Sequence, residues 1–406
     1  MSARLHIPDE LVHPGWKDHQ EAADNVIPNL ISGSLEAEKD SMVRLEFAND
    51  GQPSSGTAFI VKIPGSKKTV ILTAAHNLRS STLKPTTNLQ AVFRDGKIVA
   101  IDHATCYVPP EYKGSDSSIG DWAAIFLDKS IHGDKGFNFS LALSYTEKIQ
   151  GEVSVIAYRD PTPAYSPEIA SGRCKTCFEE QVEYLAKTEQ GNSGAPVCVA
   201  YRGYMTVIAI HNRRPAYRKG GSTGARLTRQ LMMKVFELSG ALETDVMLRG
   251  WGDPRGKKYS VPRGLHLIFP EDWAFGRVRL GTGSKFDVIP VYSGPEGDRY
   301  ALWTTATSAT GKWVRFDVPQ DQVELVDILK DESHFAKSNV SKTGWMKIVV
   351  DGPKEDGTAP KRYQLSLAGT MIMEGDPDDE ETSEVSFVEY PKEEDDKIVK
   401  ISFIKA

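Results

Sequence analysis

Cysteine is scarce in this chain, and so are long apolar runs and any excess of basic charge. Four cysteines in 406 residues are too few to build a disulfide scaffold. A formal net charge of -6 and a pI near 5.9 give no overall basic field, so we expect no nucleic-acid partner. No apolar run is long enough to span a bilayer, so we expect no membrane partner either.

The first 40 residues are polar and mixed, and they lack the continuous apolar core of a secretory signal. The low cysteine content is typical of proteins from a reducing compartment. We therefore expect a soluble, cytoplasmic protein whose residues 1–40 form an N-terminal arm.

Cys174 and Cys177 form a CxxC motif, which is found in redox pairs and in halves of zinc sites. The sequence has no second CxxC and no histidine pair at ligand spacing to complete a zinc site. We interpret the two cysteines as reduced thiols on or near a strand, and we expect no metal and no cofactor. Redox or metal chemistry at this pair is the alternative enzyme class.

Short runs rich in Val and Ile, separated by Gly, Asp, Asn and Ser, begin near residue 42 and predict the strands of a β-sandwich or barrel. The runs are 42–47, 56–63, 69–75, 89–93, 97–101, 122–127, 153–158 and 204–210. A helical pattern, with apolar residues at three- and four-residue spacing, follows at 228–242. We assign residues 41–242 to one domain.

Residues 243–264 are rich in Gly, Pro and charge, which is typical of a linker. More strand-like runs follow at 265–269, 286–292, 300–305, 345–350, 363–369 and 398–404. We therefore expect residues 265–406 to form a second, all-β domain. A domain of this kind can recruit substrate or a regulatory partner, but no motif in it names a ligand.

Ser193 lies in the sequence TEQGNSGAPVC, with glycines on both sides. Glycine permits the tight turns that expose a hydroxyl and direct successive backbone N–H groups to one point. Ser193 is therefore a candidate nucleophile, and the N–H groups of Gly191 and Ser193 are candidates for an oxyanion hole.

A serine nucleophile needs a base, and the base needs an acid that orients it. His76 ends the apolar run TVILTAAH, so a strand would hold its imidazole in a fixed position. Asp121 precedes the apolar run WAAIFL and is our candidate for the acid. Asp102, which directly continues a strand-like run, and Asp116, in a Ser-rich loop, are the alternatives.

The motifs TAAH, DWAAIFL and GNSGAP, in this order, resemble those of the trypsin/chymotrypsin-like serine endopeptidases. The resemblance covers residues 40–242. It implies two antiparallel six-stranded β-barrels with a terminal helix, and catalysis by His76, Asp121 and Ser193 through an acyl-enzyme. It leaves residues 265–406 unexplained.

Asn192 departs from the digestive members of this family, which carry Asp immediately before the nucleophile. In those enzymes the Asp pairs with a freshly cut N-terminus and switches the enzyme on. Asn192 cannot form that ion pair and instead resembles glutamyl endopeptidases and certain viral processing enzymes of the same fold. We therefore expect activity without a cleavage of the digestive kind.

The resemblance also places three residues in the pocket for the substrate's P1 side chain. Lys187 stands where trypsin-like members hold an acid, so it would repel basic side chains. Thr188 and His211 match the hydroxyl and imidazole with which glutamyl endopeptidases bind a carboxylate. Further positive potential is expected from Arg213, Arg214 and Arg226.

These residues predict cleavage after Glu, with Gln or Asp as the alternative P1 residues, in a protein or peptide substrate. For Thr188 an ordinary loop hydroxyl is the alternative interpretation, and for His211 a strand-end histidine bonded to backbone. The alternative function is a catalytically inactive, protease-like binding or scaffold module. Against it, the chain has kept His76, Asp121 and Ser193.

Overall fold

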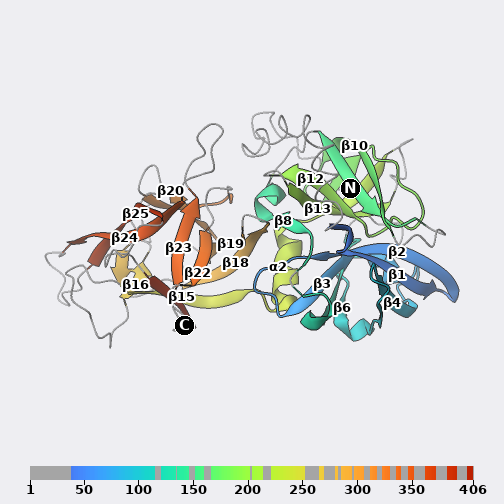
Figure 1. Ribbon diagram of the computed structural model, residues 1–406, viewed down its shortest axis with the longest axis horizontal. Helices are drawn as coiled ribbons and strands as arrows, with labels where there is room; N and C mark the ends of the chain where they lie inside the picture. The colour runs from blue at the N-terminus through green and yellow to red at the C-terminus, as the bar shows by residue number, and fades with distance from the viewer. Residues whose placement is uncertain are drawn as a thin grey trace. The chain divides into compact units, whose positions relative to one another are not determined.

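The computed structural model describes most of the chain from residue 38 to residue 405 (Figure 1). The residues outside the description within this range are 115–119, 134, 146–150, 160–165, 202–203, 214–220, 252–264, 269–278, 282–284, 295–296, 306–310, 318–321, 330–334, 340–345, 352–361, 372–381 and 391–399. The chain divides into two compact units, one of Met1–Ala241 with Tyr292–Pro295, and one of Leu242–Val291 with Glu296–Ala406.

The first unit begins with an antiparallel sheet of seven strands in the order β5-β4-β1-β2-β3-β7-β6. Its strands are β1 (Met42–Asn49), β2 (Gln52–Val61), β3 (Lys68–Thr73), β4 (Thr87–Phe93), β5 (Ile98–Ala100), β6 (Cys106–Tyr107) and β7 (Ala123–Asp128). Alternate residues of β1, namely Val43, Leu45 and Phe47, lie in one buried apolar cluster, as expected for a strand with one face on a core. The sheet curls around this cluster.

The second sheet of this unit closes on itself in the cycle β9-β10-β11-β14-β13-β12-β9, with every pair antiparallel. Its strands are β9 (Glu152–Ala157), β10 (Glu168–Cys177), β11 (Gln181–Tyr184), β12 (Pro196–Tyr201), β13 (Tyr204–Arg213) and β14 (Ser222–Arg226). Strand β8 (Asn138–Ser140) pairs in parallel with β13. The barrel encloses a second buried apolar cluster.

Helix α2 (Arg229–Ser239) ends the continuous part of this unit (Figure 1). The Thr228 hydroxyl accepts a hydrogen bond from the backbone N–H of Leu231 at 3.1 Å and so caps the first turn. Gly240, with φ 72°, ends the helix in the left-handed conformation that favours glycine. The short 3-10 helices are η1 (Ala75–Asn77), η2 (His103–Thr105), η3 (Lys129–Ile131) and η4 (Leu141–Tyr145).

This architecture confirms the predicted fold class: two β-barrel sheets, a terminal helix and a further β-rich unit. The first sheet differs from the six-stranded barrel that we expected, because it has seven strands and is open, with the short β5 and β6 at its two edges. No helix among the described residues is both long enough and apolar enough to cross a membrane.

The described part of the second unit consists of strands. They are β15 (Glu243–Trp251), β16 (Leu265–Ile268), β17 (Arg279–Gly281), β18 (Lys285–Ser293), β19 (Arg299–Thr304), β20 (Trp313–Asp317), β21 (Gln322–Val326), β22 (Phe335–Asn339), β23 (Met346–Asp351), β24 (Arg362–Met371), β25 (Thr382–Tyr390) and β26 (Lys400–Lys405). Trp313 is fully buried and packs edge-on against Trp303, with ring centroids 4.8 Å apart. Aromatic burial of this kind gives the unit its own core.

The predicted linker 243–264 needs a correction, because its first part is strand β15. From Val246 to Trp251 this strand pairs with β26, at the far end of the sequence. Composition cannot reveal a pairing with so distant a segment, and here it outweighs the Gly and charged residues that are typical of a linker. Residues 252–264, and residues 1–37 of the predicted arm, lie outside the described residues. The remaining domain boundaries stay a prediction.

Candidate active site

His76 and Asp121 are brought together by the pairing of β3 with β7. In this antiparallel pair Thr73, the last residue of β3, lies opposite Ala123, the first residue of β7. The residues that follow β3 and those that precede β7 therefore meet at one edge of the sheet. His76 lies in η1, directly after β3, and Asp121 lies two residues before β7.

The Asp121 carboxylate holds His76 through two contacts. His76 Nδ1 lies 2.9 Å from Asp121 Oδ2, and the backbone N–H of His76 donates to Oδ1 at 3.1 Å. Burial of Asp121 raises its pKa, but the neighbouring His76 and Arg213 outweigh this and hold the pKa below its ordinary value. An ionised carboxylate at Nδ1 keeps the proton on that nitrogen and leaves Nε2 to act as a base.

The alternative acids do not occupy this position. Asp102 caps η2, where its exposed carboxylate accepts a hydrogen bond from the N–H of Ala104 at 2.9 Å. Asp116 lies outside the described residues. Asp121 is therefore the carboxylate that the structure pairs with His76.

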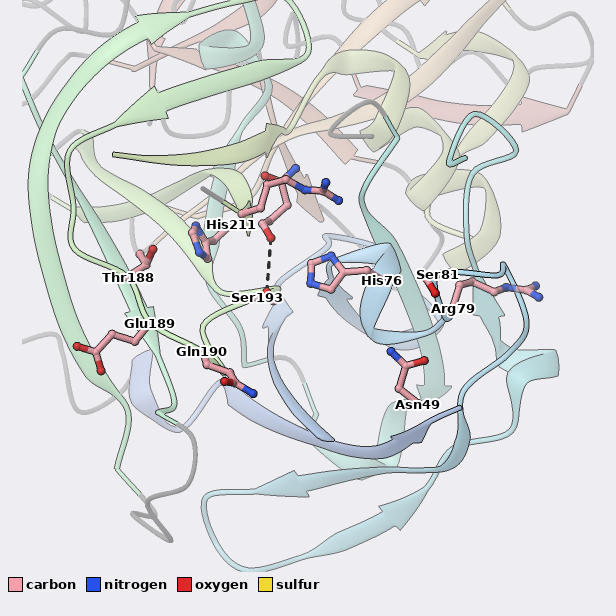
Figure 2. Close-up of a pocket in the computed structure, with 11 residues that line it drawn as sticks. Asn49, His76, Arg79, Ser81, Thr188, Glu189, Gln190, Ser193 and His211 are labelled. Atoms are coloured by element: carbon pink, nitrogen blue, oxygen red, sulfur yellow. Dashed lines mark hydrogen bonds between the residues drawn. The ribbon is translucent and has the colours of Figure 1, made fainter. Parts of the chain in front are cut away.

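Ser193 lies in the loop between β11 and β12, and its hydroxyl shares a cleft with His76. Figure 2 shows the two side chains next to each other. The Ser193 hydroxyl donates to the carbonyl oxygen of Asn212 at 3.4 Å, which the dashed line marks, rather than to the imidazole. In enzymes without bound substrate, the hydrogen bond between a catalytic serine and its base is often long or poorly aligned.

Two backbone N–H groups next to the serine hydroxyl are unpaired within the described part of the chain. Among the described residues, the N–H groups of Gly191 and Ser193 have no acceptor, whereas the N–H groups of Asn192 and Gly194 donate to the carbonyls of Glu189 and His211. Gly191 has φ 91°, in the region that favours glycine. Two unpaired donors beside a serine hydroxyl are the arrangement that an oxyanion hole needs.

The carbonyl groups of the same loop are tied to the first sheet. The Gly191 carbonyl accepts a hydrogen bond from the Thr57 hydroxyl at 2.7 Å. The Ser193 carbonyl accepts from the Thr57 N–H at 2.8 Å and from the Asn77 side-chain amide at 2.9 Å. These bonds fix the peptide planes of the loop. Thr57 and Asn77 escaped the sequence analysis, although Asn77 directly follows the TAAH motif.

Asn192 is buried, and both polar atoms of its side chain form hydrogen bonds with neutral backbone groups. Its Oδ1 accepts from the Glu189 N–H at 2.7 Å, and its Nδ2 donates to the Tyr158 carbonyl at 2.9 Å. The amide therefore braces the loop through hydrogen bonds to neutral backbone groups.

The cleft has a volume of about 460 Å³ and contains two of the three residues predicted for the P1 pocket. Figure 2 shows Thr188 and His211 on one side of Ser193 and His76 on the other. The residues that line the cleft are Asn49, His76, Arg79, Ser81, Thr188, Glu189, Gln190, Ser193, His211, Asn212 and Arg213.

Lys187 is not among them, which corrects its predicted place in the pocket. The segment that leads to Thr188 is extended, and its side chains alternate: Tyr184, Ala186 and Thr188 are buried, whereas Leu185 and Lys187 are exposed. Successive side chains of an extended segment point to opposite faces. The position of Lys187 a few residues before Ser193 did not show the direction in which its side chain points.

His211 is a buried, neutral imidazole. Burial, reinforced by the charge of His76, lowers its pKa to about 3. Its Nδ1 lies 2.6 Å from the Tyr184 hydroxyl, which is also 3.2 Å from the Thr223 carbonyl oxygen. His211 Nε2 has no hydrogen-bond partner within the described part of the chain.

The Thr188 hydroxyl lies 2.7 Å from Ser222 Oγ, which in turn lies 3.0 Å from the Ala186 carbonyl oxygen. Either hydroxyl can be the donor between the two, and when Ser222 donates to Thr188, the Thr188 proton is left for a ligand in the cleft. Ser222, in strand β14, was not found by the sequence analysis, because only the pairing of β14 with β11 brings it there.

The three arginines expected to add positive potential to the pocket do not all lie in it. Arg213 lines the cleft and places Nη2 3.4 Å from Asp121 Oδ2. Arg226 is buried and donates to backbone carbonyls, among them those of Leu143 and Phe178, so it braces the barrel. Arg214 lies outside the described residues.

Cys174 and Cys177 lie on β10 and form no disulfide. The Cys174 thiol donates to the Glu183 carbonyl at 3.7 Å, and the Cys177 thiol donates to the Phe178 carbonyl at 3.8 Å. Within the described ranges, no three His, Cys, Asp or Glu side chains gather as metal ligands. Both thiols lie away from the cleft that holds His76 and Ser193.

Comparison with solved structures finds several serine proteases. A Glu endopeptidase is 16% identical and covers 50% of this chain and 91% of its own, with a TM-score of 0.40. The thermostable serine protease AL20 from an extremophilic microorganism is 12% identical and covers 50% of this chain and 99% of its own, with a TM-score of 0.40. The Rv3671c protease from M. tuberculosis is 16% identical and covers 52% of this chain and 87% of its own, with a TM-score of 0.37. No protein-family model and no curated protein matches the chain.

Proposed function

We propose that this chain is a serine endopeptidase that cleaves protein or peptide substrates through an acyl-enzyme, with a preference for Glu at P1. The observation that carries the proposal is the site itself. A buried carboxylate holds an imidazole, and the imidazole shares a cleft with a serine beside two unpaired backbone N–H groups.

In the proposed reaction, the Ser193 hydroxyl turns from the Asn212 carbonyl to His76 Nε2, gives up its proton and attacks the scissile carbonyl carbon. Negative charge develops on the carbonyl oxygen between the N–H groups of Gly191 and Ser193. His76 then passes the proton to the leaving amine, and the acyl-enzyme forms. Water then attacks the acyl carbon while His76 takes one of its protons, and His76 returns a proton to Ser193 Oγ as the bond to the serine breaks, which releases the acid product and restores both side chains.

Asp121 supports this cycle by stabilising the imidazolium that forms twice in it. The carboxylate is fully buried and accepts from both the ring and the backbone of His76. Its reduced pKa keeps it ionised at neutral pH. No metal or cofactor enters the proposed reaction.

For the P1 side chain, the proposal rests on Thr188 and His211, which lie on the same side of Ser193 (Figure 2). Burial raises the pKa of Tyr184 well above its ordinary value, so its hydroxyl keeps one proton. When that proton goes to His211 Nδ1, the imidazole carries its own proton on Nε2 and can donate to a Glu carboxylate. When it goes to the Thr223 carbonyl, Nε2 becomes an acceptor, which suits the amide nitrogen of Gln.

We favour Glu because the Tyr184–His211 contact is the shorter of the two, at 2.6 Å against 3.2 Å. The charges of the cleft also favour an acid. Arg79 lines it, and the carboxylate of Glu189, which lines it too, lies 3.5 Å from Arg159 Nε and is partly neutralised there.

Labelling with a fluorophosphonate probe tests the catalytic part of the proposal. We expect the wild-type chain to be labelled without prior cleavage and the Ser193→Ala variant to remain unlabelled. Equal labelling of the two proteins, or none of the wild type, would favour the inactive binding module. His76→Ala should lose labelling as well, whereas Cys174→Ser combined with Cys177→Ser should keep it.

Peptides that differ only at P1, with Glu, Gln, Asp, Arg or Phe, test the specificity. We expect the highest kcat/KM for Glu, and a loss of about tenfold for this peptide in Thr188→Val, the cost of about one hydrogen bond to a charged group. Lys187→Ala is the matched control, because Lys187 is exposed and outside the cleft. A preference for Arg or Phe would contradict the proposed specificity.

A cytoplasmic location, and a substrate-recruiting or regulatory role for residues 265–406, belong to the same proposal. They rest on the sequence. Proteins that the Ser193→Ala variant retains from cell extract would identify what the chain binds. New N-termini that appear with wild type and not with Ser193→Ala, measured by N-terminal proteomics, would identify what it cleaves.

A further inference from the structure

Arg213 touches the carboxylate of the proposed catalytic pair. Its Nη2 lies 3.4 Å from Asp121 Oδ2, and this same oxygen lies 2.9 Å from His76 Nδ1. Arg213 is the last residue of β13, and the register of β13 against β14 shifts between His211 and Arg213. Residues two apart on a strand share a face, and His211 and Arg213 line the same cleft.

The other described titratable or charged groups around His76 and Asp121 are either uncharged or in contact with other partners. His211 is neutral, with a pKa of about 3. Burial raises the pKa of the Tyr112 hydroxyl, so Tyr112 stays uncharged. On the walls of the cleft, Arg79 donates to the Leu83 carbonyl at 3.4 Å, and Glu189 lies beside Arg159. Among the residues that the structure describes, Arg213 is the cation in contact with Asp121.

We propose that Arg213 is a positioning residue of the peptidase site, whose guanidinium fixes the Asp121 carboxylate and whose positive charge opposes protonation of the His76 imidazole. The inference rests on the proposed function. It extends the working range of the enzyme to lower pH, because the base of the reaction must be neutral to accept the serine proton.

The physical reason is the sharing of one carboxylate by two cations when the imidazole is protonated. Asp121 is fully buried, so water does not stabilise its negative charge. When the imidazole is protonated, the guanidinium and the imidazolium both interact with this one carboxylate, and the two cations repel each other. The Arg213 side chain is 25% exposed, so its influence is reduced by solvent and should weaken further in high salt.

The test compares wild type, Arg213→Gln and Arg213→Lys by the pH profile of kcat/KM. For Arg213→Gln, the midpoint of the acid limb should rise by about 0.5 to 1 pH unit, the usual effect of losing a partly screened neighbouring charge. Arg213→Lys should restore most of the acid limb, and 1 M salt should reduce the difference between wild type and Arg213→Gln.

A superimposable acid limb in Arg213→Gln would overturn the inference. So would a lower plateau with an unchanged midpoint, because that result indicates a purely structural role. A change confined to KM would also overturn it, since Arg213 would then bind substrate rather than act through His76.

A second readout does not need activity. The titration of the His76 ring can be followed by NMR with ¹⁵N-labelled histidine in a Ser193→Ala background, with His76→Gln to assign the resonance. Its midpoint should rise when Arg213→Gln is added. If wild type is not labelled by the fluorophosphonate, the proposed function fails, while this titration still decides whether Arg213 acts on His76.

Discussion

Asn192→Asp replaces the buried amide of the serine loop with a carboxyl group of the same shape. In the wild type, Oδ1 accepts from the Glu189 N–H, and Nδ2 donates to the Tyr158 carbonyl. The introduced carboxyl can keep the first bond in either protonation state. It can keep the second only when it is protonated, because a carboxylate has no proton to donate.

The magnitude follows from the burial of this position, where the side chain is 6% exposed in the wild type. Burial beside a carbonyl oxygen should raise the pKa of the introduced carboxyl by about 2 units above the ordinary Asp value of about 3.9, which corresponds to about 3 kcal/mol. The folded-state pKa is then higher than the unfolded one. The variant should therefore match wild type below about pH 4 and lose stability as the pH rises toward about 6.

Urea unfolding of wild type and variant at pH 4 and pH 7.5 measures this difference. Gln190→Glu is the matched control, because Gln190 is exposed, and it should cost under about 0.5 kcal/mol at both pH values. At pH 7.5 fluorophosphonate labelling of Asn192→Asp should also fall, since the loop loses a brace. A variant as stable as wild type at pH 7.5 would refute the account of Asn192.

Two further predictions concern the same barrel. His211 has a folded-state pKa of about 3 against an ordinary 6.5, so its stability contribution is complete above pH 6.5 and is lost as the pH falls toward 3. Between pH 6.5 and 4.5 wild type should lose about 2 kcal/mol more than His211→Gln in urea unfolding, and parallel curves for the two would contradict this. Gly194→Ala would place its Cβ 2.0 Å from the Thr57 carbonyl oxygen at φ 91°, so we expect a loss of over about 3 kcal/mol and of labelling. Gly51→Ala, where φ is 83° with open space around the Cβ, should cost only about 1 kcal/mol, and equal costs would argue against the clash.

Local patterns determined the class of fold. Short Val- and Ile-rich runs predicted the strands of the first unit, and the three- and four-residue spacing at 228–242 predicted helix α2, which spans Arg229–Ser239. These features depend on neighbours in the sequence, so the sequence displays them. Strand β15 was missed because it is held by pairing with other segments, among them β26 some 150 residues further along the chain.

The candidate site divides in the same way. The sequence by itself marked His76, Asp121 and Ser193, because each lies in a short motif with a recognisable pattern of glycines or apolar runs. Thr188 and His211 were marked by their resemblance to residues of glutamyl endopeptidases. Which aspartate meets the imidazole was decided by the register of β3 against β7.

Tertiary structure also decided the surroundings of these residues. The alternation of an extended segment turned Lys187 outward, and the folded chain places Arg213, at the end of β13, against Asp121. The direction of a side chain and its partner across a sheet depend on segments distant in sequence, and therefore only the folded chain fixes them.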